Sequence, residues 1–193
     1  MNNKKTILIL ITVLLLIVSC SSDSNKNQKA WNLVMKDGLL YNDSLALKPF
    51  TGHYKGSVMG QRIEYEVVDG KRTGLFVVYN ENGNVETFGY QKENKNHGEW
   101  KYYYPNGSLE SIGLFADDKP DSIWTWFYIN GNLMQEGRFS GGIRDGDWKF
   151  YNESGNLYAI IRYKDDLIVD SIRYELPGIN SEVSTDSAYK YSE

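Results

Sequence analysis

Groups that could catalyse a reaction are few in this sequence. The two histidines, His53 and His97, each stand beside a glycine, and a general base or a metal ligand is one interpretation of them. A turn residue is the interpretation that we favour, because a metal site needs further ligands and the chain has a single cysteine. Metalloprotease, serine-hydrolase and phosphate-loop motifs are missing from the sequence. We therefore predict no enzyme, no catalytic residue, no metal site and no cofactor.

Aromatic side chains are the better candidates for contact with a ligand, since Trp and Tyr rings stack on sugars and anchor protein partners. The chain has 5 Trp, 15 Tyr and 7 Phe among its 193 residues. Most of them follow the repeating pattern described below, but Trp126, Tyr104 and Tyr128 depart from it. The sequence therefore predicts a central binding patch made of Trp126, Tyr104 and Tyr128.

Acidic residues recur at the loops expected between the repeats. The candidates for an acidic edge are Asp117, Asp118, Asp145, Asp165 and Asp166. One interpretation is an edge that attracts calcium or a basic partner. The other is a set of solvated turns that discourages edge-to-edge pairing, and we favour it because no calcium-loop spacing is present.

The charge balance argues against one class of partner. The chain has 21 basic and 25 acidic residues, which gives a formal net charge of −4. Nucleic-acid affinity depends on phosphate contacts with a basic surface. We therefore expect no nucleic-acid partner.

The elements that must position these groups follow from an internal repeat. Four units of 24 residues align without a gap, at 71–94, 95–118, 119–142 and 143–166. The repeated columns are Phe76, Trp100, Trp124 and Trp148; Gly83, Gly107, Gly131 and Gly155; Gly89, Gly113 and Gly137 with Ile161 as the exception; and Gly74, Gly98 and Gly146 with Ser122 as the exception. Because the four units carry the same residue types at the same positions, they predict a repeat array. The repeated aromatic residues would pack in a core that adjacent repeats share.

Each unit is predicted to be a β-hairpin. In the second unit, Pro105, Asn106 and Gly107 favour the backbone angles of a three-residue hairpin loop with a bulge at the glycine. The fold class is therefore all-β, an elongated antiparallel sheet of consecutive 24-residue β-hairpin repeats.

The N-terminus carries a secretion signal. Lys4 and Lys5 precede an apolar run over 7–18, which is too short to cross a bilayer of about 30 Å. The run ends at Cys20 in a sequence that resembles a bacterial lipobox, which implies that Cys20 carries a lipid after cleavage. The predicted segments are a signal peptide at 1–19, a flexible tether at 20–30, a leading cap with a degenerate repeat at 31–70, four repeats at 71–166, a closing strand at 167–174 and a polar tail at 175–193.

One segment of the second unit carries a family resemblance. Residues 98–109, GEWKYYYPNGSL, resemble the MORN-repeat variant found in bacterial proteins that are often labelled antitoxin-like. The resemblance extends from about residue 49 to 170, most of the mature chain, and implies an elongated antiparallel sheet of consecutive hairpins. It implies no catalytic site, because the shared positions are turns and core aromatics.

Two functions are favoured by the sequence. The first is a non-catalytic lipoprotein, anchored to the membrane through Cys20, whose repeat sheet binds a protein or a glycan. The second, implied by the family label, is an antitoxin or immunity protein that neutralises a partner toxin by binding it. A hydrolase with an unrecognised carboxylate site is a third alternative. We expect the protein in the bacterial cell envelope, anchored at the outer membrane. It lies on either the periplasmic face or the surface face of that membrane.

Overall fold

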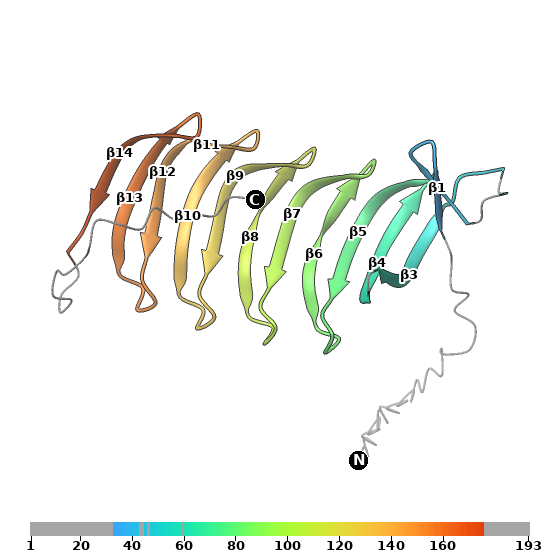
Figure 1. The fold of residues 1–193 in the computed structure, drawn as a ribbon, viewed down its shortest axis with the longest axis horizontal. Coiled ribbons are helices and arrows are strands. Elements are labelled where there is room, and N and C mark those ends of the chain that lie inside the picture. Colours follow the sequence, from blue (N-terminus) through green and yellow to red (C-terminus); the bar gives the residue numbers. More distant parts are fainter. Residues whose placement is uncertain (1–32, 43–44, 46, 59, 176–193) are drawn as a thin grey trace, which may run out of the picture.

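The computed structural model describes residues 33–42, 45, 47–58 and 60–175, which form strands joined by turns and loops (Figure 1). The signal peptide, Cys20, the tether and residues 176–193 of the predicted tail lie outside the described residues. The strands are β1 (Val34–Lys36), β2 (Leu39–Tyr41), β3 (Gly52–Val58), β4 (Gln61–Val68), β5 (Lys71–Tyr79), β6 (Val85–Lys92), β7 (Lys95–Tyr103), β8 (Leu109–Ala116), β9 (Lys119–Phe127), β10 (Leu133–Ser140), β11 (Ile143–Arg144), β12 (Gly146–Tyr151), β13 (Leu157–Lys164) and β14 (Leu167–Arg173). Among these described residues, none belongs to a helix long and apolar enough to cross a bilayer.

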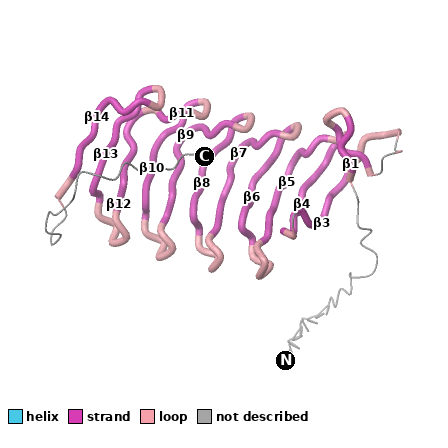
Figure 2. The backbone as a smooth tube through the Cα atoms, viewed as in Figure 1, coloured by secondary structure: helices cyan, strands magenta, loops and turns pink. Residues whose placement is uncertain are grey.

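Strands β3 to β14 form one antiparallel sheet of 12 strands, and β1 and β2 form a separate pair. Apart from β11 and β12, each strand of the large sheet pairs with its neighbours in the chain, as in a row of hairpins. Strands β11 and β12 both pair with β10 and are separated at Asp145. The predicted elongated sheet of consecutive hairpins is thereby confirmed. Figure 2 shows it as a single curved layer, with the hairpin turns along one edge and the turns between repeats along the other.

The hairpin turns have the predicted glycine geometry. In the second unit the backbone N–H of Gly107 donates to the carbonyl of Tyr104 at 2.8 Å, and Gly107 has a φ of 86°. Tyr102 pairs with Ser111 and Tyr103 with Leu109. This shift in register forms a bulge at Glu110, which has no partner residue on β7.

The core of the repeats is a set of indole rings laid over glycines. Trp100, Trp124 and Trp148 are 3%, 5% and 4% exposed. Each indole N–H donates to a backbone carbonyl on the strand beside it in the sheet, as Trp124 does to Leu114 at 3.0 Å. A Cβ on the underlying Gly113 would overlap the Trp124 ring. A Cβ on Gly89 would likewise overlap the Trp100 ring, and one on Gly137 the Trp148 ring. The glycine column and the indole column therefore form one packing unit that is shared by adjacent hairpins.

The two ends of the sheet are built differently. At the first end, Leu40 on β2 and Phe50, just before β3, pack on Tyr65 and Val67 in a small buried cluster. Backbone bonds fix this cap, since Leu40 N–H donates to Gly70 and Phe50 N–H donates to Leu40, both at 2.8 Å. At the other end lies β14, whose residues are all exposed. The described cap thus covers only the β3 end of the array.

Candidate binding groove

A row of side chains runs across the middle of the sheet on the face that carries the indoles. Register pairs Thr87 with Tyr102, Tyr102 with Ser111, Ser111 with Trp126 and Trp126 with Gln135. Residues that face one another across antiparallel strands point to the same side of the sheet. The five residues therefore form one line that crosses β6 to β10, in which aromatic and polar groups alternate.

The first hollow on this face lies beside Trp126 and has a volume of about 380 Å³. Its floor is mainly aromatic, with Trp124, Trp126 and Phe139 in contact with one another. The Trp124 and Trp126 ring centroids are 5.7 Å apart and their planes are tilted by 32°. Tyr102 and Glu110 form part of its wall. The hollow is thus an apolar depression with one carboxylate beside it.

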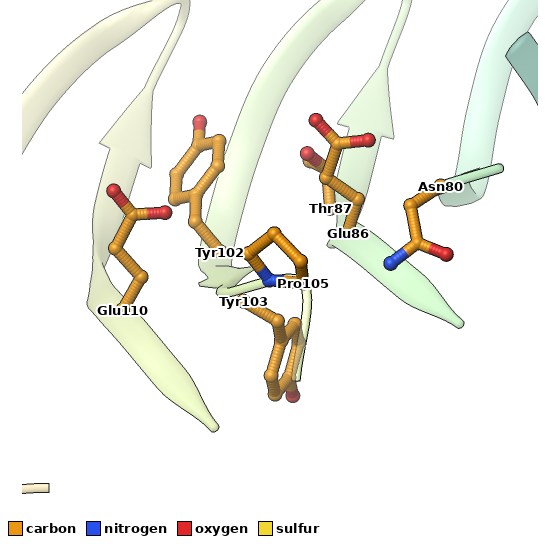
Figure 3. Close-up of a pocket in the computed structure, with 7 residues that line it drawn as sticks. All are labelled: Asn80, Glu86, Thr87, Tyr102, Tyr103, Pro105 and Glu110. Carbon is orange, nitrogen blue, oxygen red and sulfur yellow. The ribbon is translucent and has the colours of Figure 1, made fainter. Parts of the chain in front are cut away.

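The second hollow, of about 260 Å³, lies between the first two repeats. Glu86, Thr87, Tyr102 and Glu110 line it, and in Figure 3 the ring of Tyr102 lies between the two glutamate side chains. Both hollows include Tyr102 and Glu110, so they adjoin each other. We call the two together the aromatic groove. It extends over β6 to β10.

The charged side chains that line the groove are all acidic. Its two carboxylates, Glu86 and Glu110, form no ion pair with any residue that the structure describes, although Glu86 accepts a hydrogen bond from Gln61 at 2.7 Å. Neither Lys nor Arg is among the described residues that line it. Burial raises the pKa of the Tyr102 hydroxyl, so this group remains a neutral hydrogen-bond donor beside Glu110. The groove therefore presents negative charge next to aromatic rings.

The predicted aromatic patch is only partly brought together. Trp126 lines the groove, but Tyr104 and Tyr128 do not. The Tyr104 hydroxyl donates to the carbonyl of Phe127 at 2.7 Å, and the Tyr128 hydroxyl donates to that of Tyr151 at 2.8 Å. These two tyrosines connect the end of one hairpin to the next, because their aromatic rings reach across to the neighbouring strand. Tyr102 and Glu110 line the same hollow as Trp126, and a ligand site shared by Trp126, Tyr104 and Tyr128 stays a prediction.

The predicted acidic edge exists as a row of turns. Asp117 and Asp118 have φ values of 50° and 68°, and Asp165 and Asp166 have φ values of 51° and 63°. The Asp118 carboxylate accepts the backbone N–H of Asn96 at 2.7 Å, and Asp166 does the same for Arg144 at 3.0 Å. These carboxylates therefore hold adjacent turns together.

The remaining candidates are also held in local contacts. Asp145 accepts a hydrogen bond from Lys164 at 3.1 Å. His53 on β3 lies 3.3 Å from Glu64, and His97 is on β7, four strands away in the sheet order. Within the described part of the chain, no three His, Cys, Asp or Glu residues are grouped so as to hold a metal ion.

Sequence reasoning missed the two glutamates that line the groove. Glu86 and Glu110 occupy one repeat column, which continues as Met134 and Tyr158. The available signal was a charge that occurs in only part of a column, three residues after the turn glycine. It was overlooked because the bulge that places both glutamates beside the aromatic row depends on strand register.

Comparison with known families agrees with this architecture. Residues 96–117 and 144–165 match the family model described as the MORN repeat variant, and these stretches contain the β7–β8 and β12–β13 hairpins. No curated protein matches the sequence. The resemblance drawn from residues 98–109 is thus confirmed, and the chain carries MORN-variant repeats of the kind that indicate a repeat-based binding protein.

Proposed function

We propose that this repeat array is a non-catalytic, membrane-anchored lipoprotein that uses one face of its sheet to bind a protein or glycan partner. The aromatic groove is the observation that supports this function most directly. Aromatic rings next to a small number of polar groups are typical of surfaces that bind a partner. The row from Thr87 to Gln135 crosses five strands, so the repeats themselves present the surface.

The anchor in this proposal is a lipid on Cys20. The basic residues at positions 4 and 5, the short apolar run and the single cysteine support it. Two or more acyl chains hold a protein firmly at a bilayer, because each buried methylene contributes about 0.8 kcal/mol. The repeat sheet would then be presented from the outer membrane of the bacterial envelope, beyond the segment 20–30.

Metabolic labelling and partner capture test the two parts of the proposal separately. The full-length protein should incorporate labelled palmitate and stay with membranes after a high-salt wash, whereas Cys20→Ser should do neither. Partners that are cross-linked to the full-length protein in intact cells should be lost in Trp126→Ala, with Ile129→Ala as the control, because Ile129 is exposed and lies in a hairpin turn. Equal recovery of every partner with both variants would contradict a role for the groove.

A second candidate is an immunity protein that neutralises a basic toxin. The negative groove and the net charge of −4 favour this alternative, since they would attract a basic partner. Rescue of growth when the protein is expressed with the product of an adjacent toxin-like gene would support it. Lack of rescue would leave the first function in place.

A further inference from the structure

We propose that the aromatic groove binds a basic peptide segment in which one cationic side chain stacks beside Tyr102 and Trp126 and pairs with Glu110, while a second pairs with Glu86. This inference rests on the proposed binding function and specifies its partner. The partner is an extended segment with two Lys or Arg residues close together in sequence.

Charge complementarity is the first reason. Glu86 and Glu110 lie on one face without a cationic partner among the described residues, so a basic ligand would supply their counter-charge. An anionic ligand would meet two carboxylates and no Lys or Arg in the described lining. Glu86 is half-buried and Glu110 is exposed, so partial removal from water strengthens the attraction of a cation to Glu86 in particular.

The protein already uses the same contact within its own sheet. The guanidinium carbon of Arg144 lies 4.2 Å from the ring centroid of Tyr163, while its Nε donates to the carboxylate of Asp166 at 2.9 Å. The guanidinium of Arg62 lies 3.7 Å from the centroid of the Tyr79 ring. A cation stacked on an aromatic ring and paired with a carboxylate is therefore compatible with the strand spacing of this sheet.

The spacing of the two glutamates suits an extended peptide. Glu86 is on β6 and Glu110 on β8, so two strand spacings separate them, about 10 Å. Residues i and i+2 of an extended chain point the same way and lie about 7 Å apart. The long side chains of Lys and Arg span the remaining difference, which predicts basic residues at i and i+2.

A neutral sugar fits the groove less well. Trp124 is 5% exposed and its ring is tilted by 32° to that of Trp126, so the rings do not form a flat open platform. The Trp124 indole N–H is already bonded to Leu114 and offers nothing to a sugar hydroxyl. A neutral ligand would also leave both carboxylates without a counter-charge.

Calorimetric titration of the full-length protein in neutral detergent micelles tests the inference. The probe is a seven-residue peptide with arginines at positions 3 and 5, and the matched control is the same peptide with citrulline, which keeps the shape and removes the charge. We expect binding of the arginine peptide that weakens with added salt, and about tenfold or greater loss with Glu110→Gln or Glu86→Gln. Glu153 lies in the exposed turn between β12 and β13, outside the groove. Glu153→Gln removes the same charge there and should leave the affinity for the peptide unchanged.

The outcomes separate this inference from the proposed function. Equal binding of the arginine and citrulline peptides, no binding, or full binding by the Glu86→Gln/Glu110→Gln double variant would overturn the basic-segment ligand. Binding of chito-oligosaccharide that is lost in Trp126→Ala would replace it with a glycan ligand. If the cross-linked partners depend on Trp126 while the arginine peptide fails, the binding function stands and only the class of partner is wrong.

Discussion

The indole of Trp124 lies on the backbone of Gly113, and a Cβ at Gly113 would overlap that ring. The pairing explains two exceptions in the repeat columns. Ile161 replaces the glycine in the last unit, and the residue that faces it on the following strand is Ser171, so no indole covers this position. At the first end, Tyr65 occupies the glycine column and stacks on Phe76, with centroids 6.4 Å apart. Glycine is thus required only where an indole from the next hairpin covers it.

Replacing Gly113 with Ala should destabilise the repeat array by about 1–3 kcal/mol, the usual cost of forcing an extra carbon into a packed site. The Trp124 indole cannot yield easily, because its N–H is bonded to the carbonyl of Leu114 at 3.0 Å. Denaturant unfolding followed by tryptophan fluorescence measures the effect as a lower midpoint.

The control for this prediction is the double variant Gly113→Ala/Trp124→Phe, which restores room above the strand. Its loss of stability should be smaller than the sum of the two single losses, since the clash is removed along with the indole. Additive losses would show that Gly113 does not act through Trp124.

Replacing Ser122 with Gly should stabilise the third repeat. Ser122 has a φ of 61°, and the same column elsewhere holds Gly74, Gly98 and Gly146 with φ of 100°, 73° and 84°. A left-handed residue with a Cβ costs about 1–2 kcal/mol, whereas the extra freedom of glycine in the unfolded chain costs about 0.5–1 kcal/mol. We expect a net gain of up to about 1 kcal/mol, measured as a higher thermal midpoint.

The contrast for Ser122 is Ser140→Gly, at a strand residue that does not have a positive φ. That change should lower the thermal midpoint, since no strain is relieved. A lower midpoint for Ser122→Gly as well would mean that the hydrogen bond from Ser122 to Asp121, at 3.2 Å, outweighs the strain.

The architecture could be predicted because it is repeated. A turn glycine such as Gly107 and an indole such as Trp100 recur every 24 residues, so each column gave several observations of one local rule. The β1–β2 cap occurs once, and its contacts join Leu40 to Gly70 across 30 positions of chain. Such a long-range contact leaves no period in the sequence.

The binding groove could be predicted only in part. Trp126 was identified because it departs from its column, and it does line the groove. Tyr104 and Tyr128 also depart from theirs, but the reason is structural, since their hydroxyls bond to the next hairpin. The place of Glu110 depends on a one-residue shift between β7 and β8. The sequence alone cannot tell whether a residue differs from the rest of its repeat column for a structural or a functional reason, because the strand register is needed to decide.

Replacing Tyr104 with Phe should therefore reduce stability and leave ligand binding intact. The change removes the hydroxyl that donates to Phe127 at 2.7 Å, a loss of about 0.5–1.5 kcal/mol for one hydrogen bond. Tyr128→Phe should have a similar effect, and Tyr90→Phe serves as a control, because Tyr90 is 46% exposed and lines neither hollow of the groove. Unfolding midpoints and the arginine-peptide titration measure the two properties side by side. Weaker peptide binding by Tyr104→Phe at unchanged stability would return this residue to the ligand site.

Acid should weaken the turn between the last two strands through Asp166. The side-chain hydrogen bond from Arg144, at 2.9 Å, is the main cause that lowers the pKa of Asp166 below its ordinary value of 3.8. A carboxyl whose pKa is lower in the folded state stabilises the fold above its ordinary pKa, and this contribution is lost as the pH falls through the folded value. Because the Asp166 side chain is 48% exposed, we expect a contribution below about 1 kcal/mol.

The variant Asp166→Asn tests this acid dependence. Asn94 occupies the same column in the first unit and accepts the backbone N–H of Arg72 at 2.8 Å, so an amide preserves the turn. The variant should be slightly less stable than the wild type at pH 7, where the ionised carboxylate still pairs with Arg144. The difference should shrink as the pH falls below the ordinary pKa of 3.8 and vanish below the lowered pKa of folded Asp166, where both side chains are uncharged. Thermal midpoints measured between pH 2.5 and pH 7 give the comparison, and a constant offset over that range would show that Asp166 does not stabilise the fold through its charge.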